Sequence, residues 1–377
     1  SRFPTFETAR DELEITQDLT AYRIRNTDTG LTFIADKEVY SPSEISSLIG
    51  ANHYKSRTGV EFTPYEINLF TPHAKARKEE HWKFKPLQSP LTKIKAKSYT
   101  PVVLEKAGVK SVVRGTEVSA FHIKHTEHQY GIFPFEDGKS VPLEPTELQS
   151  KTPKIYGYVV ENRKIIESQS ATSLNYRRGE TKKGQKHFYS LGKVGTYTYA
   201  PHIVVYRDNT DMGAAAVLQR RVAPWGDEIV PVPEKHSAII SQTNENYYHN
   251  VTGLGIEEID FRKLPDGQEE YTKQEERDIT EDEAYYICAI LNSPITKLYF
   301  QISSDARGIS KEKVVGSIKL PLYDPGNKVH VNLMEIAKKA TVQGHATAYQ
   351  LKSLDENYLA LCSDIEVQEE SATEKKI

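Results

Sequence analysis

The sequence predicts an α+β fold in which a sheet-rich part comes first and a helical segment follows. From about residue 101 to 265, short apolar and β-branched runs are separated by Gly, Pro and Asp turns, as in a series of short strands. After residue 279, apolar residues recur at helical spacing from Ile287 to Ile302. The two patterns meet at Thr280-Glu281-Asp282-Glu283, which has the spacing of a helix capping box.

The first hundred residues mix both patterns. The stretch IRNTDTGLTFIAD predicts a β-hairpin that turns through Asp28-Thr29-Gly30. The stretch SPSEISSLI predicts a short helix capped by Ser41 or Ser43. Residues 71–100 are rich in Pro and Lys, a composition that favours a loop-dominated segment.

Strands are expected in the middle region at TPVVL, EVSAFHI, YGIFPF, IYGYVV, TYTYAPHIVVY, AAAVL and SAIIS. Glu136-Asp137-Gly138 is the turn that follows the third of these runs. In the fifth run, Tyr197 and Tyr199 alternate as strand residues do. Pro201 then interrupts the strand or places it at a sheet edge.

The C-terminal segment is predicted to be helical. Pro294 stands where a second helix would begin. The stretch GISKEKVVGSIKLPLYDP predicts a glycine turn, one helical turn capped by Ser310, a short strand and a proline exit. Two further helices are expected in residues 327–362, and a disordered tail in residues 363–377.

Length and composition indicate a globular protein. The 377 residues suffice for two domains or for one large domain with extensions. Hydrophobic residues make up 38% and no apolar run is as long as a membrane span, so we expect neither disorder nor a membrane partner. Two cysteines and no secretory signal peptide favour a cytoplasmic location. The chain begins with Ser1, and we expect it to be a fragment of a longer polypeptide.

Charge is segregated along the chain, although the net charge is only −3. Residues 72–124 hold 12 Lys/Arg against 4 Asp/Glu, and residues 151–193 hold 10 against 3. Residues 257–283 hold 4 Lys/Arg against 12 Asp/Glu. A bound polyanion responds to the local field, so the basic segments favour such a partner. Each lysine run taken alone is more commonly a solvated surface.

The sequence offers no catalytic motif that we recognise. A Walker loop, a Gly-x-Ser-x-Gly elbow and a His-Glu-x-x-His pair are all absent. Gly253-Leu254-Gly255 is too short for a dinucleotide-binding loop. His122, His125 and His128 would point to alternate faces of a strand, which favours surface histidines over a zinc site. We therefore expect no catalytic centre and no metal site.

The helical end resembles the segment that closes the target recognition domains of restriction–modification enzymes. In that family a helix carrying Leu-Asn-Ser leads to a glycine turn, a short helix and a strand ending in Ile-x-Leu-Pro. The corresponding residues here are Leu291-Asn292-Ser293, Gly308 and Ile318-Lys319-Leu320-Pro321. Type I restriction specificity subunits share this ending, but they have two recognition domains separated by long helices, and this chain has one set of the motifs.

Four further stretches resemble the same family, in the family's order, so that the resemblance covers residues 57–340. YSLGKVGTYTYAPHIVVYR resembles a segment of the type IIG enzymes and related adenine-specific DNA methyltransferases, and departs from it at Tyr199, His202-Ile203 and Tyr206. RTGVEFTPYEINLF resembles the opening of these domains, and VVRGTEVSAF and YGIFPFEDGK resemble two runs between the others.

The resemblance implies sequence-specific recognition of double-stranded DNA for a larger adenine methyltransferase or restriction enzyme. The chain lacks the family's Gly-rich S-adenosylmethionine loop and its Asn-Pro-Pro-Tyr tetrapeptide. We therefore expect no enzyme activity and no cofactor here, and expect S-adenosylmethionine and a methyltransferase or endonuclease partner for the parent protein. The resemblance implies four parts. Residues 1–56 link to an upstream methyltransferase domain and residues 57–326 form the recognition domain, followed by C-terminal helices at 327–362 and a tail at 363–377.

Candidate DNA-binding residues are the cations and tyrosines of the basic segments and of the stretch before the predicted strand at 203–207. Lys, Arg and Tyr hydroxyls suit phosphate contacts, which fix the register of a protein on the duplex. The candidates are Lys83, Lys85, Lys93, Lys95, Arg177, Arg178, Lys182, Lys183, Lys186, Lys193, Tyr197 and Arg207. For the tyrosine alone, a place in the sheet core is the commoner role.

Two other classes of function stay open. A nuclease with an unrecognised acidic cluster would show metal-dependent cleavage. A protein-interaction module would use the acidic residues 257–283 as a docking face and would not bind DNA at low salt.

Overall fold

The computed structural model describes residues 21–26, 30–35, 40–87, 100–124, 128–168, 187–207, 214–244, 247–250, 259–260, 271–273, 276–303 and 315–374. These residues confirm the predicted α+β fold. Sheets occupy the N-terminal and middle parts of the chain, and helices form its C-terminal part.

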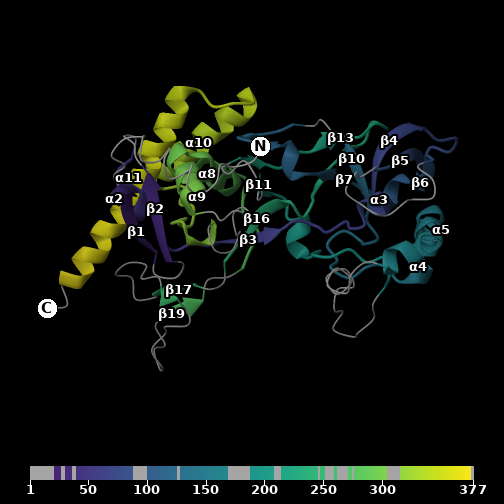
Figure 1. Ribbon diagram of the computed structural model, residues 1–377, viewed down its shortest axis with the longest axis horizontal. Coiled ribbons are helices and arrows are strands. Elements are labelled where there is room, and N and C mark those ends of the chain that lie inside the picture. The colour runs from purple at the N-terminus through teal and green to yellow at the C-terminus, as the bar shows by residue number, and fades with distance from the viewer. Residues whose placement is uncertain are drawn as a thin grey trace, which may run out of the picture.

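A four-stranded antiparallel sheet lies near the centre of the molecule (Figure 1). Its strands, in the order β12-β11-β16-β3, span Ala215–Val217, Val204–Arg207, Ser237–Thr243 and Tyr54–Thr58. Successive strand residues point to opposite faces. Val204 and its partner Ile240 therefore join the largest apolar core on one face, whereas Val205 and Ile239 join a smaller core on the other.

Helices cover the face of this sheet that carries Val204. They are α2, α8, α9, α10 and α11, at Pro42–Ser47, Glu281–Asn292, Pro294–Ser303, Lys328–Gln343 and Ala348–Glu374. Every residue of α8 from Glu283 to Asn292 is buried, as is typical of a helix at the centre of a core. The predicted capping box at Thr280 and the predicted start of a helix at Pro294 are confirmed.

The helix prediction at SPSEISSLI is also confirmed, and Ser41 rather than Ser43 is the capping residue. The two helices predicted in 327–362 are present as α10 and α11. The second of them continues to Glu374, so the boundary predicted at residue 362 is wrong. Ser310, expected to cap a helical turn, lies outside the described residues.

Asn292 of the Leu-Asn-Ser stretch ties α8 to the edge of the four-stranded sheet. Its Nδ2 donates to the carbonyl of Ala215 at 2.7 Å, and its Oδ1 accepts from the N–H of Ala215 at 3.1 Å. The buried amide thus replaces the strand that would otherwise pair with β12. The next residue, Ser293, accepts from the N–H of Thr296 at 3.3 Å and so caps α9.

A six-stranded sheet forms the second large unit. Its order is β15-β7-β10-β4-β5-β6, at Val232–Pro233, Val109–Val113, Gln129–Ile132, Leu69–Lys75, His81–Pro86 and Val102–Glu105. All neighbours are antiparallel except β15 and β7. One face carries Phe70, Phe84 and Tyr130, and packs against α4, α5 and α6 at Pro145–Lys151, Pro153–Glu161 and Arg163–Glu167.

The prediction of a loop-dominated segment at residues 71–100 is wrong for its described part. β4 and β5 form a hairpin there, in which Trp82 and Phe84 are buried and Lys83 and Lys85 are exposed. This alternation has the period of a half-buried strand. The lysines make the composition of this stretch polar, whereas the period of two identifies it as a strand. Residues 88–99 lie outside the described part of the chain.

The prediction of a strand at IYGYVV is wrong too, because these residues form α5. The run is rich in β-branched and aromatic residues, which favours a strand locally. Ile155 and Val159 nevertheless stand one helical turn apart and are both buried against the sheet. Glu105 of β6 also accepts from the N–H groups of Lys154 and Ile155 at 2.8 and 3.0 Å, which satisfies the helix start.

The run TYTYAPHIVVY is a strand only in its second half. Residues Thr196–Tyr199 form the 3-10 helix η3, and β11 begins three residues after Pro201. The strand predicted for Tyr197 and Tyr199 is therefore wrong, whereas the predicted interruption by the proline is confirmed. The run EVSAFHI is divided into β8 and β9, at Val118–Ser119 and His122–Ile123.

Smaller elements complete the fold. β1 and β2, at Ala21–Asn26 and Gly30–Ala35, confirm the predicted N-terminal hairpin. The others are α3 (Tyr65–Asn68), η1 (Lys106–Gly108), η2 (Gly115–Glu117), β13 (Arg221–Val222), β14 (Glu228–Ile229), β17 (Tyr247–Asn250), β18 (Ile259–Asp260), β19 (Tyr271–Lys273) and η5 (Val315–Ser317). In Figure 1, α8 to α11 gather on one side and the six-stranded sheet lies on the other, with β3 and β16 between them.

Candidate nucleic-acid interface

The turn before β11 holds two of the candidate residues, Lys193 and Tyr197. The Tyr197 hydroxyl donates to the carbonyl of Lys193 at 2.8 Å, and the hydroxyl of Ser241 donates to the carbonyl of Tyr197 at 3.1 Å. A Cβ at Gly195 would overlap the ring of Tyr197, so the turn requires glycine there. These contacts fix the tyrosine ring beside β16.

Arg57 of β3 stacks on the ring of Tyr197, with its guanidinium carbon 4.5 Å from the ring centre. Burial raises the pKa of the Tyr197 hydroxyl, and Arg57 partly offsets this. The edge of the guanidinium stays available for hydrogen bonds, and its Nη2 donates to the carboxylate of Glu276 at 2.9 Å. Lys55, two residues away on the same face of β3, donates to the other oxygen of Glu276 at 2.9 Å.

Tyr65 forms a second stack of cations on a tyrosine. The side chains of Arg114 and Lys235 lie 5.6 and 5.4 Å from its ring centre. The hydroxyl donates to the carboxylate of Glu234, and burial together with that carboxylate raises the pKa of Tyr65 far above its ordinary value. The tyrosine therefore stays neutral, and its ring can hold both cations in place.

Backbone bonds join the two stacks. Val60 donates to the carbonyl of Pro233 at 2.8 Å, Lys235 donates to that of Val60 at 2.9 Å, and Glu61 donates to that of Gly192 at 2.9 Å. The segment that links β3 to β4 therefore touches both the β15–β16 turn and the turn before η3. We call the resulting group the waist surface: Lys55, Arg57, Tyr65, Arg114, Lys193, Tyr197 and Lys235.

The waist surface combines five cations with tyrosine rings. Among the described residues, Glu276 pairs with Lys55 and Arg57, Glu61 pairs with Lys235, and Glu234 accepts from the hydroxyl of Tyr65. A tyrosine ring under a guanidinium leaves the N–H edge free to meet a phosphate and reduces the conformational entropy lost on binding. This arrangement suits a phosphate backbone.

Lys83 and Lys85 lie elsewhere, on the face of the six-stranded sheet opposite Phe84. Leu69 and Val112 belong to the same face and carry an apolar core near its other end. β5 is four strand spacings from β15, about 19 Å. Both lysines are exposed and form no ion pair with any residue in the described stretches.

Arg207 has an internal role in the structure. Its Nε donates to the carbonyl of Gly115 at 2.8 Å, and its Nη2 donates to that of Thr116 at 3.1 Å. The guanidinium thereby ties the end of β11 to η2, and two of its nitrogens are engaged by backbone carbonyls. The remaining candidates lie outside the described residues: Lys93, Lys95, Arg177, Arg178, Lys182, Lys183 and Lys186.

Four cations of the waist surface were missed from the sequence: Lys55, Arg57, Arg114 and Lys235. The tyrosines under Arg57, Arg114 and Lys235 and the carboxylate that pairs with Lys55 all stand far away in the chain, so only the fold brings these partners together. The family resemblance offered a signal for two of them. Arg57 belongs to RTGVEFTPYEINLF and Arg114 belongs to VVRGTEVSAF, and both stretches resemble parts of recognition domains.

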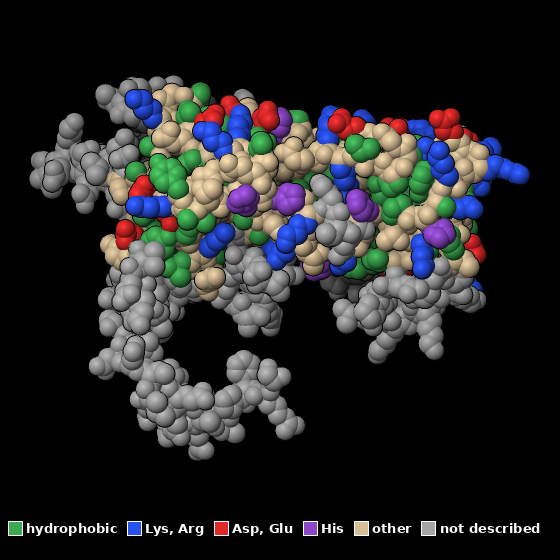
Figure 2. All heavy atoms as spheres, turned by 90° about the horizontal axis from the view of Figure 1, so that it is seen from above, with side chains coloured by type: hydrophobic (Ala, Val, Ile, Leu, Met, Phe, Trp, Pro, Cys, Tyr) green, Lys and Arg blue, Asp and Glu red, His purple; other side chains and the backbone are tan. Residues whose placement is uncertain are grey.

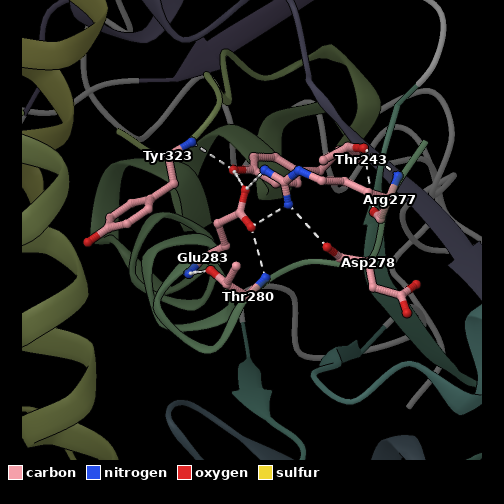
Figure 3. A network of polar contacts seen from close by, with 7 residues as sticks. Thr243, Arg277, Asp278, Thr280, Glu283 and Tyr323 are labelled. Atoms are coloured by element: carbon pink, nitrogen blue, oxygen red, sulfur yellow. Dashed lines mark hydrogen bonds and ion pairs between the residues drawn. The ribbon is translucent and has the colours of Figure 1, made fainter. Parts of the chain in front are cut away.

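A polar network beside the waist surface holds the start of α8 (Figure 3). Both oxygens of Glu283 accept from Arg277, each at 2.8 Å, and one also accepts from the N–H of Thr280 at 2.8 Å. The hydroxyl of Tyr54 donates to the same carboxylate at 3.1 Å. Burial alone would raise the pKa of Glu283, but the bonds from Arg277 and Thr280 outweigh it and lower the pKa. The network fixes the segment that carries Glu276.

The upper face of the molecule has mixed charge. In Figure 2, acidic and basic side chains are interspersed there, and histidines lie along the middle among the coloured residues. Within the described stretches, no group of three or more His, Cys, Asp or Glu side chains is arranged to hold a metal ion. None of the described helices is both long enough and apolar enough to cross a membrane.

Comparison with known proteins gives no assignment: no family model matches the chain, and no curated protein matches it. Support for a function therefore comes from the waist surface and from the sequence motifs that resemble target recognition domains.

Proposed function

We propose that this chain recognises a base sequence in double-stranded DNA, as the target recognition part of an adenine methyltransferase or restriction enzyme. The observation that carries the proposal is the waist surface. It comprises five cations on chain segments that are joined by backbone hydrogen bonds, and three of these cations stack on tyrosines. Cations held in this way favour phosphate contacts along a backbone.

The sequence motifs support the same function. Stretches that resemble recognition domains include five residues of the waist surface. Arg57 and Tyr65 lie in RTGVEFTPYEINLF, Arg114 lies in VVRGTEVSAF, and Lys193 and Tyr197 lie in YSLGKVGTYTYAPHIVVYR. Base reading would come from polar side chains on loops beside these phosphate contacts. In this proposal the waist surface positions the duplex, and the neighbouring loops select its sequence.

Selection from a pool of randomised duplexes tests the proposal. Duplexes retained by the immobilised chain are amplified and sequenced over several rounds at moderate salt. We expect one motif to be enriched. The variant Arg57→Gln should retain less DNA but enrich the same motif, because phosphate contacts carry no sequence information. A retained pool with the composition of the input would contradict sequence recognition.

A further inference from the structure

Glu276 occupies the donor groups that the waist surface would offer to a phosphate. One carboxylate oxygen accepts from Arg57 and the other from Lys55, each at 2.9 Å. The three side chains are 24–29% exposed, so water and ions reach the contact. A second polar partner of Arg57 is the side-chain carbonyl of Gln242, at 3.3 Å.

The backbone holds Glu276 at this place. Thr243 at the end of β16 donates to the carbonyl of Arg277 at 2.9 Å, and Ile279 donates to that of Ser241 at 3.0 Å. Residues 276–279 therefore run alongside β16. The buried partner of Arg277, Glu283, anchors this short segment to α8 (Figure 3). The position of the carboxylate is thus set by the fold and not by a free side chain alone.

We propose that Glu276 is an internal competitor for DNA phosphates at Lys55 and Arg57. A carboxylate and a phosphodiester each carry one negative charge and accept the same charge-assisted hydrogen bonds. A phosphate that approaches the two cations displaces the glutamate side chain, whose exposed position lets it rotate into water. This inference rests on the proposed DNA-binding function and adds a control on it.

The exchange reduces the gain from each phosphate contact. A cation that leaves a glutamate for a phosphate exchanges one anion for another, and the displaced carboxylate stays close to the DNA and repels it. The surface therefore presents about one positive charge fewer to the duplex than its count of cations indicates. Because the salt dependence of DNA binding follows the charge neutralised, the glutamate makes that dependence weaker.

The variant Glu276→Gln removes the competitor and tests the inference. Fluorescence anisotropy with a labelled random duplex, at several salt concentrations, should give roughly fivefold tighter binding at low salt, the value of one partly exposed ion pair. The log–log salt slope should become steeper by about one unit. In the background of Arg57→Gln, the same substitution should produce less than half of this gain, since one of the two released cations is gone.

The control is Glu356→Gln on α11, which removes a carboxylate from an exposed pair with Lys352 and changes the net charge equally. It should bind like the wild type. Equal gains in both variants would show a general charge effect and overturn the inference, as would an unchanged Glu276→Gln. Glu276→Ala should reproduce the gain, and thermal melts check that each variant is folded.

Inorganic polyphosphate separates this inference from the proposed function, because it binds accessible cations without being DNA. If no variant binds duplex but Glu276→Gln binds polyphosphate more tightly than wild type and Glu356→Gln, the competition stands and the DNA proposal fails. If duplex binds and neither polyanion distinguishes Glu276→Gln from wild type, the DNA proposal stands and the competition fails. If neither polyanion binds, both fail.

Discussion

Two glutamates seven positions apart in the chain, Glu276 and Glu283, are each held by an arginine, and burial makes their roles different. The side chain of Glu283 is 2% exposed and accepts hydrogen bonds from Arg277, Thr280 and Tyr54. The side chain of Glu276 is 27% exposed and pairs with two partly exposed cations on β3, Lys55 and Arg57. The same kind of ion pair serves as a fixed anchor in one place and as an exchangeable contact in the other.

Solvation explains the difference. A buried carboxylate that loses its partners keeps the full cost of desolvation, so its bonds cannot be exchanged without loss of stability. An exposed carboxylate regains hydration when its partners leave, so its pairs contribute at most about 1 kcal/mol. The acidic segment can therefore carry a structural group and a regulatory group side by side.

The largest effect that tests this comparison is on stability. Glu283→Ala removes the glutamate half of the capping box, the partner of Arg277 and the acceptor of the Tyr54 hydroxyl. We expect it to reduce the free energy of unfolding by about 3 kcal/mol, whereas Glu276→Ala should reduce it by less than about 1 kcal/mol. Urea unfolding followed by circular dichroism measures both. Equal losses in the two variants would contradict the contrast between anchor and exchangeable contact.

Acid should remove the contribution of Glu283. Its pKa is lowered in the folded chain from the ordinary value of 4.5, so the unfolded chain takes up the proton first as the pH falls. The stability due to this carboxylate is complete above pH 4.5 and is lost as the pH falls through the lower folded pKa. Urea midpoints from neutral pH to about pH 3 should fall less steeply in Glu283→Gln than in wild type. Parallel pH profiles would show that the pKa of Glu283 is the same in the folded and unfolded chain, and would contradict the lowered pKa.

A smaller effect distinguishes an internal arginine from those of the waist surface. Arg207→Gln leaves the carbonyls of Gly115 and Thr116 without their donors and should cost about 1–2 kcal/mol of stability. DNA affinity and its salt slope should stay at the wild-type level, because two nitrogens of the guanidinium are already engaged by backbone carbonyls. Thermal unfolding and anisotropy give the two readings. Weaker DNA binding with unchanged stability would show that Arg207 contacts a phosphate, as the sequence predicted.

Local patterns in the sequence predicted the anchors well. Thr280 and Glu283 stand three positions apart, so the capping box is visible in four letters. Local composition failed where a distant partner decides the structure. IYGYVV has the residues of a strand, yet Glu105 on β6 satisfies the start of a helix that places Ile155 and Val159 against the sheet.

The candidate site shows the same limit. Tyr197 was predicted to contact DNA from its place beside a basic turn, and its ring does lie at the surface that carries the cations. The cation that stacks on it, Arg57, comes from a strand far earlier in the chain. Sequence reading names residue types that suit phosphate, but only the pairing of β3 with β16 shows which of them share a surface.

The most direct test of the account is the salt dependence of duplex binding by the wild type, Arg57→Gln and Lys352→Gln. Because Arg57 contributes a phosphate contact in this account, the log–log salt slope of Arg57→Gln should be about one unit shallower than that of the wild type. The variant should bind random and selected duplexes more weakly by similar factors. Lys352→Gln removes an exposed cation on α11 and should change neither slope nor affinity. Equal slopes in all three proteins, or no binding to duplex at low salt, would contradict a phosphate-binding waist surface.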